Sequence, residues 1–239
     1  MIDKFNNYLA KYDMNNYNIN YRYKHSYRVK DLCETIAKRL DLNEEDTYII
    51  SVIGLLHDIG KFEQIKLTGD QQDRGFKHGD YGADLLFKQN LISKFQVDEK
   101  YYDIIEFAIR NHDKRKINKV SDSRKMFFAK FIRDIDKIDI IYALGTLKDY
   151  NILDADDEIT EEVKNEFENL ISIDYSFVKN KSDKVVLTLA YIFDINFKNS
   201  LKLISEKKLL DNFYNNLQDK NKFKYYFDVV NNYIKERIW

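Results

Sequence analysis

The most constraining feature of the sequence is a helical spacing of apolar residues along almost the whole chain. Between residues 29 and 40, for example, apolar side chains recur at steps of three and four, which places them on one face of a helix. The chain contains no proline, the residue that most strongly breaks helix interiors. No segment shows the alternation that is typical of a strand. The sequence therefore predicts an all-α protein.

Local signals divide this pattern into helices and loops. Asn43 is a predicted N-cap, and the acidic residues that follow it suit the positive end of a helix dipole. That helix should end near residues 58–61, with Gly60 as its C-terminal breaker. A loop is expected from Glu63 to Lys77, because the apolar spacing lapses there and glycine and aspartate accumulate. Further helices are expected over about residues 80–88, 99–111 and 123–147.

Composition excludes several classes of protein. Lys and Arg number 39 against 40 Asp and Glu, so no overall field attracts nucleic acid or an anionic membrane. The single cysteine, Cys33, excludes an internal disulfide framework. The most apolar window, residues 49–56, is far shorter than the roughly 20 residues that cross a bilayer, and residues 1–7 do not resemble a signal peptide. We therefore expect a cytoplasmic protein without a membrane span.

The four histidines are the candidate functional residues. His25 and His112 share the apolar faces of their helices, His57 closes an apolar run, and His78 stands just before a helix start. One such histidine is most simply a hydrogen-bonded core residue. Four without a shared partner would be costly, because each buried ring needs hydrogen bonds. Neutral imidazole is the commonest metal ligand, so the pattern favours convergence of the four around metal.

Carboxylates stand where such a metal site needs them. Asp58 follows His57, and because adjacent helical residues diverge by about 100°, the two can share a metal only where the helix ends. Asp136 lies at the edge of the apolar stripe of its helix and is the favoured distal ligand. Asp139 is the alternative, as a partner behind the ligands, and Asp134 is expected to lie in solvent.

The order of these residues resembles that of the HD-domain metal-dependent phosphohydrolases, an all-helical superfamily. The resemblance covers about residues 20–148 and is carried by three segments, His25-Ser26-Tyr27-Arg28-Val29, Leu55-Leu56-His57-Asp58-Ile59-Gly60-Lys61 and His78-Gly79-Asp80-Tyr81-Gly82. It implies an HD-domain-like helical bundle that binds two divalent ions, which share Asp58. The implied ligands are His25, His57, Asp58 and Asp136 for the first ion, and His78, His112 and Asp58 for the second. Such mixed ligands admit Fe, Mn, Co, Ni, Zn or Mg.

The resemblance also implies a reaction. Two ions of this kind activate water and clamp a phosphate group, so the expected activity is hydrolysis of a phosphate ester or phosphoanhydride of a nucleotide-like small molecule. Phosphatase, phosphodiesterase and diadenosine tetraphosphatase-like activities all remain open. Asp58 and Lys61 are the candidate catalytic residues. The candidate substrate-binding cations are Lys61, Arg28, Lys114 and Arg115. Surface charge explains Lys61 equally well, Arg28 is a weaker candidate than Lys61, and exposed charge is the usual meaning of a basic run such as the one with Lys114 and Arg115.

Two further questions concern the whole chain. We expect residues 1–150 to form the HD-type metal-binding catalytic domain and residues 151–239 a helical C-terminal extension packed on it, separated near the acidic stretch from Asp154 to Glu158. The extension contains no histidine, and packing, substrate selection or dimerisation are its possible roles. The alternative to an enzyme is a metal-stabilised binding or regulatory module without catalysis. The sequence does not indicate the oligomeric state.

Overall fold

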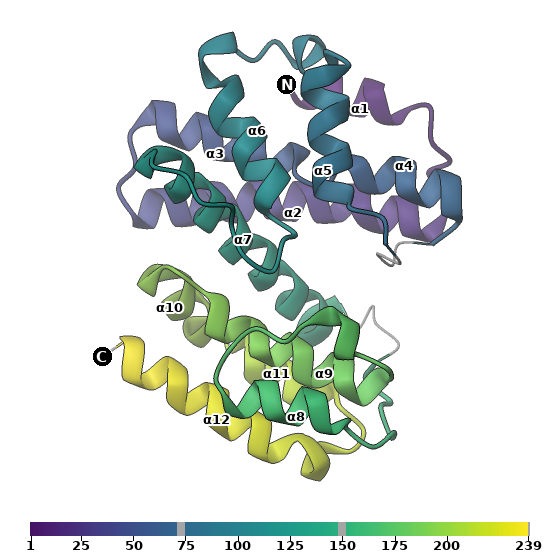
Figure 1. Ribbon diagram of the computed structural model, residues 1–239, viewed down its shortest axis with the longest axis vertical. Coiled ribbons are helices and arrows are strands. Elements are labelled where there is room, and N and C mark those ends of the chain that lie inside the picture. The colour runs from purple at the N-terminus through teal and green to yellow at the C-terminus, as the bar shows by residue number, and fades with distance from the viewer. Residues whose placement is uncertain (71–74, 148–151, 239) are drawn as a thin grey trace. The chain divides into compact units, whose positions relative to one another are not determined.

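The structure is a computed structural model that describes residues 1–70, 75–147 and 152–238, and every regular element in these ranges is a helix (Figure 1). The predicted all-α class is therefore confirmed. The chain divides into two compact units, residues 1–133 and 134–239, and the division falls inside the continuous helix α7 (Ser123–Tyr142). The domain boundary expected at residues 150–151 lies outside the described residues. No described helix is both long and apolar enough to cross a membrane.

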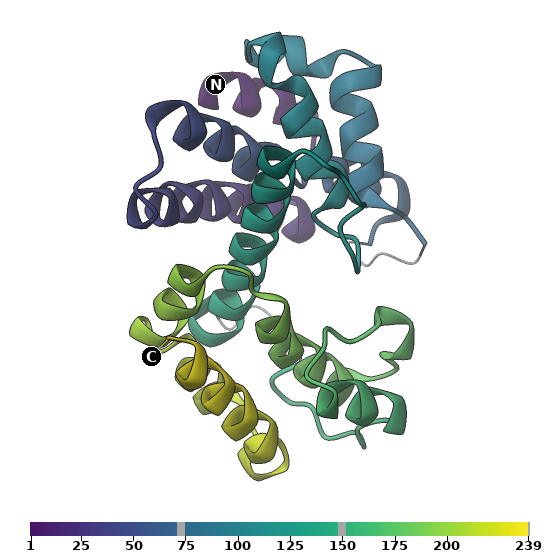
Figure 2. The same ribbon diagram turned by 60° about the vertical axis from the view of Figure 1, so that its left-hand side comes forward.

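The first unit is built around two long helices that lie side by side, α2 (Tyr17–Arg39) and α3 (Glu44–Leu56) (Figure 2). The predicted stripe of α2 is buried, and Val29, Cys33 and Ile36 are fully inaccessible to solvent. Asn43 caps α3 as predicted, because its side chain accepts a hydrogen bond of 2.8 Å from the backbone N–H of Asp46. The other elements of this unit are α1 (Ile2–Leu9), α4 (Ile59–Thr68), α5 (His78–Ala83), η1 (Asp84–Lys88), η2 (Leu91–Phe95), η3 (Glu99–Tyr101), α6 (Tyr102–Asn111) and the first turns of α7.

The region after α3 differs from the prediction. Helix α4 occupies the first half of the expected loop and ends at Gly69, whose φ of 71° is the left-handed conformation that glycine adopts readily. Gly60 is thus an interior residue of α4 and not a breaker. A Cβ atom there would lie 2.9 Å from the backbone nitrogen of Gly82 and would clash with the carbonyl oxygen of His78. Glycine is needed at this position because α4 and α5 approach each other closely.

The second unit contains the last turns of α7 and the remaining helices. Its core includes the fully buried rings of Phe167, Phe213 and Phe223. Asp134, expected in solvent, is also fully buried, and its carboxylate accepts hydrogen bonds of 2.9 Å from the backbone N–H groups of Asn196 and Phe197. The expectation was wrong because these amides are the unpaired donors that precede a helix start. The helices after α7 are η4 (Ala143–Leu147), α8 (Glu161–Glu168), η5 (Tyr175–Phe177), α9 (Lys181–Ala190), η6 (Tyr191–Asp194), α10 (Lys198–Glu206), α11 (Leu209–Asn216) and α12 (Lys220–Ile238).

Candidate metal centre

The junction between α3 and α4 brings two adjacent side chains to one place. His57 is the C-cap of α3 and Asp58 is the N-cap of α4, so the helix is interrupted between them. As a result, the Nε2 atom of His57 lies 3.9 Å from Oδ2 of Asp58. Both residues are buried. The two side chains can therefore face a common point although their backbone positions are consecutive.

Four imidazoles converge on this junction in two pairs. The Nε2 atoms of His25, on α2, and His57 lie 3.2 Å apart. The Nε2 atoms of His78, the first residue of α5, and His112, the C-cap of α6, lie 3.0 Å apart. All four side chains are buried. The structure thus brings together histidines from four different segments of the chain.

The carboxylate of Asp58 lies between the two pairs. Its Oδ2 atom lies 3.5 Å from Nε2 of His25, on the side of the first pair. Its Oδ1 atom lies 3.3 Å from Nε2 of His78 and 3.4 Å from Nε2 of His112. One oxygen therefore faces each histidine pair, which is the arrangement of a carboxylate that can bridge two cations.

The other nitrogen of each ring identifies the ligand atoms. Nδ1 of His57 lies 2.9 Å from the carbonyl oxygen of Gly54, and Nδ1 of His112 lies 2.7 Å from that of Ile109. Because a carbonyl oxygen only accepts, each Nδ1 carries the hydrogen, and in a neutral ring Nε2 then presents a lone pair. Such lone pairs beside a carboxylate oxygen can bind a shared cation. This donor set fits a divalent cation of the kind that binds histidine and carboxylate.

Asp136 completes one of two groups of possible ligands. Ligand atoms of His25, His57 and Asp136 all lie within 4.8 Å of one another, and so do those of His57, Asp58 and His112. Asp136 lies on α7 and is partly exposed, whereas the other ligands are buried. The two groups share His57, so they form one continuous cluster.

The comparison with known families agrees with this cluster. The family model of the HD domain matches residues 22–144, which is more than half of the chain. The chain belongs to the HD domain family. The resemblance noted in the sequence is thereby confirmed, and proteins of this family are generally metal-dependent hydrolases. No curated protein and no solved structure matches the chain.

An arginine that the sequence analysis missed contacts the HD aspartate. A guanidinium nitrogen of Arg22 lies 2.8 Å from Oδ2 of Asp58. Although burial raises the pKa of Asp58, the electrostatic effects of His57 and Arg22 outweigh it and hold that pKa well below its usual value. Arg22 precedes His25 by three residues on α2, and this helical spacing was the signal that could have identified it.

A second missed residue orients His78. The Oδ2 atom of Asp113 lies 3.4 Å from Nδ1 of His78 and accepts a hydrogen bond of 3.0 Å from the backbone N–H of Gly79. The carboxylate thus fixes both the ring and the first turn of α5. A carboxylate behind a histidine is a common support for metal ligands, and its direct succession to His112 was the signal in the sequence.

The candidate substrate-binding cations of this HD domain lie in different surroundings. Lys61 is only 4% exposed on α4, one turn after Asp58, so its interpretation as a surface lysine was wrong. The guanidinium of Arg28 lies 5.7 Å from the ring centre of Tyr21, which in turn stacks on His25. Nζ of Lys114 lies 3.3 Å from Oδ1 of Asp80. Arg115 is exposed.

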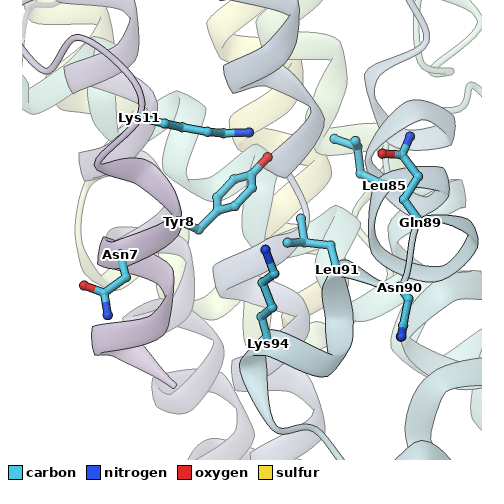
Figure 3. A pocket seen from close by; sticks show the side chains of 8 residues that line it. All are labelled: Asn7, Tyr8, Lys11, Leu85, Gln89, Asn90, Leu91 and Lys94. Carbon is cyan, nitrogen blue, oxygen red and sulfur yellow. The ribbon is translucent and has the colours of Figure 1, made fainter.

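A cavity of about 360 Å³ lies elsewhere in the first unit (Figure 3). Its lining residues come from α1, the segment after α1, η1, η2 and the segment between the last two, and include Tyr8, Lys11 and Lys94. None of the predicted ligands or substrate-binding residues lines it. The cavity is therefore distinct from the candidate metal centre.

Proposed function

We propose that the protein is a metal-dependent phosphohydrolase that cleaves a phosphate ester or phosphoanhydride of a nucleotide-like small molecule. The observation that carries the proposal is the position of Asp58, whose two oxygens face separate pairs of buried histidines. A site built only for fold stability needs neither two facing Nε2 pairs nor a carboxylate between them. The arrangement supports a dinuclear centre.

In this proposal the ligands divide as the two oxygens of Asp58 do. His25, His57 and Asp136 would hold one divalent ion together with Asp58. His78 and His112 would hold the other together with the same aspartate. Divalent ions at such a site supply Lewis-acid activation of water and neutralise the charge of a phosphate group. Fe, Mn, Co, Ni, Zn and Mg are all compatible with the donor set.

The residues of the chain itself prepare the centre for this reaction. The carbonyl oxygens of Gly54 and Ile109 hold two imidazoles with Nε2 directed at Asp58. The positive charge of Arg22 keeps the carboxylate ionised. Burial of the ligands excludes bulk water, which strengthens every charge interaction at the centre.

Several cations are proposed to bind the substrate. Lys61 is buried one turn beyond Asp58 and would contact a phosphate oxygen as a point charge. Arg28 lies against the ring that stacks on His25, so it would contact the same phosphate from α2. Lys114 and Arg115 lie two and three residues after the proposed ligand His112 and would attract the anionic substrate.

The proposal also covers the chain as a whole. Cys33 is the single cysteine and is buried, which is in keeping with a reducing compartment such as the cytoplasm. We propose that residues 151–239 form a helical extension of a catalytic domain at residues 1–150. Neither histidine pair draws on that extension, so substrate selection and dimerisation are the functions that it could add.

The deciding experiment combines metal analysis of anaerobically purified protein with a hydrolysis screen of nucleotides, nitrophenyl phosphate and its bis ester. We expect bound divalent metal and metal-dependent turnover of at least one substrate. His57→Ala removes a ligand of one ion, and Asp58→Ala removes the ligand that both ions share. Both variants should therefore lower the metal content and abolish turnover. Asp31→Asn, which changes an exposed carboxylate on α2, is the matched control and should do neither.

The outcomes separate the proposed enzyme from its alternative. Metal binding without turnover of any substrate by the wild-type protein would favour a metal-stabilised binding module. Wild-type metal content in both ligand variants would contradict the proposed centre itself.

A further inference from the structure

Arg22 forms an ion pair with Oδ2 of Asp58, the oxygen that faces the pair of His25 and His57. One nitrogen of its guanidinium lies 2.8 Å from Oδ2, the same atom that lies 3.5 Å from Nε2 of His25. The ion pair is largely withdrawn from solvent, with side-chain exposures of 16% for Arg22 and 3% for Asp58. Such a pair is more than a screened surface contact, since loss of either partner leaves a buried charge uncompensated.

The guanidinium is also held from its other side. Its central carbon lies 5.5 Å from the ring centre of Tyr21, within the range of a cation–π interaction. The ring of Tyr21 is buried and stacks on His25, with centroids 6.3 Å apart and an interplanar angle of 7°. Arg22 is therefore positioned by the same stack that positions a proposed metal ligand.

The candidate metal centre needs positive charge before any metal arrives. The carboxylate of Asp58 is buried, and a buried carboxylate is costly unless a cation pairs with it. A guanidinium stays protonated at every accessible pH, so it supplies this charge permanently. We infer that Arg22 is a built-in cation that holds Asp58 in the metal-free protein and competes with the metal ion of the first histidine pair. The inference rests on the proposed metal centre.

Arg22 should weaken metal binding, and it should do so mainly at the pair of His25 and His57. A metal at the first pair must take Oδ2 of Asp58 from Arg22 and remain close to a fixed positive charge, and both effects weaken its binding. The ion pair of Arg22 is made with Oδ2, whereas Oδ1 faces His78 and His112. Arg22 should therefore lower the metal affinity of one histidine pair much more than that of the other.

The test is a titration of metal-free protein with Co²⁺ alone, in competition with a fluorescent chelator at neutral pH. In Arg22→Gln, one equivalent of Co²⁺ should bind about ten- to a hundredfold more tightly, which is the worth of one charge-assisted hydrogen bond. The other equivalent should bind as in the wild type. Lys24→Gln, which removes a positive charge from an exposed position on α2, is the control and should change neither.

Thermal unfolding gives a second readout. Metal-free Arg22→Gln should melt at a lower temperature because Asp58 has lost its partner, yet Co²⁺ should raise its melting temperature more than it raises that of the wild type. A merely structural arginine would lower both stability and metal affinity. Should Arg22→Gln not fold, Arg22→Lys replaces it: the lysine retains the charge but loses the planar fork, so its Co²⁺ affinity should rise, by less than a full loss of charge would produce.

Three results would overturn the inference. The first is Co²⁺ binding by Arg22→Gln that is no tighter than in the wild type, and the second is Arg22→Lys binding more weakly than the wild type. The third is the absence of Co²⁺ binding by the wild-type protein, which would also refute the proposed function. If the wild type binds Co²⁺ and the variants do not bind it more tightly, only the role of Arg22 fails.

Discussion

Gly60→Ala tests how closely α4 must approach α5. In an ordinary helix interior this substitution stabilises by about 1 kcal/mol, because alanine has the higher helix propensity. Here the new Cβ would lie 2.9 Å from the backbone nitrogen of Gly82 and 3.1 Å from its Cα, and would clash with the carbonyl oxygen of His78. Backbone atoms cannot rotate away as a side chain can, so the two helices must separate.

Overpacking of this kind costs about 1–3 kcal/mol, and contacts with backbone atoms favour the upper half of that range. After the gain in propensity, we expect Gly60→Ala to lower the free energy of unfolding by about 1–2 kcal/mol. For a chain of this length the melting temperature should fall by about 2–8 °C. Since α5 begins at His78, separation of the helices should also weaken metal binding at His78 and His112.

Urea unfolding and chelator competition measure the two effects. Leu67→Ala, at a 66% exposed position on the same helix, is the control and should leave both quantities nearly unchanged. A Gly60→Ala variant at least as stable as the wild type, with wild-type metal affinity, would refute the argument from close packing. It would mean that the higher helix propensity of alanine stabilises the protein more than the close contacts of the added Cβ atom destabilise it.

Two further substitutions test carboxylates that the structure assigns to support. Asp113→Ala should lower metal affinity about ten- to a hundredfold, because it removes the partner of Nδ1 in His78. Chelator competition measures this affinity. An unchanged affinity would show that the ring of His78 needs no support from Asp113. Asp134→Ala should lower the free energy of unfolding by about 2–4 kcal/mol in urea titrations, since it leaves the backbone N–H groups of Asn196 and Phe197 without this acceptor. A loss below about 1 kcal/mol would indicate that water replaces the carboxylate.

Local patterns in the sequence were sufficient for the helices and for the family. The apolar spacing around Val29 and the cap at Asn43 are properties of neighbouring residues, so they can be read without the fold. The histidines were recognisable because each stood on or beside an apolar stripe. Their convergence in two pairs follows from tertiary packing, and the sequence alone could only suggest it.

The wrong predictions for Gly60 and Asp134 and the missed Arg22 have one physical origin: the residue that determines each role is distant in the sequence. Gly60 has the local appearance of a helix breaker, but the backbone of α5 determines its role. Asp134 has the local appearance of an exposed acid, but its partners lie more than sixty residues further on. Arg22 pairs with an aspartate on another helix. Contacts between residues that are distant in the sequence produce no regular spacing that a single sequence could show.

The junction at His57 and Asp58 has a consequence for protein engineering. These neighbours meet because one helix stops and the next begins between them. Grafting the two side chains onto an uninterrupted helix of a new scaffold would point them in divergent directions, however faithfully the remaining ligands were copied. A graft of this site must therefore include the backbone segment in which the helix is interrupted, and not only the ligand side chains.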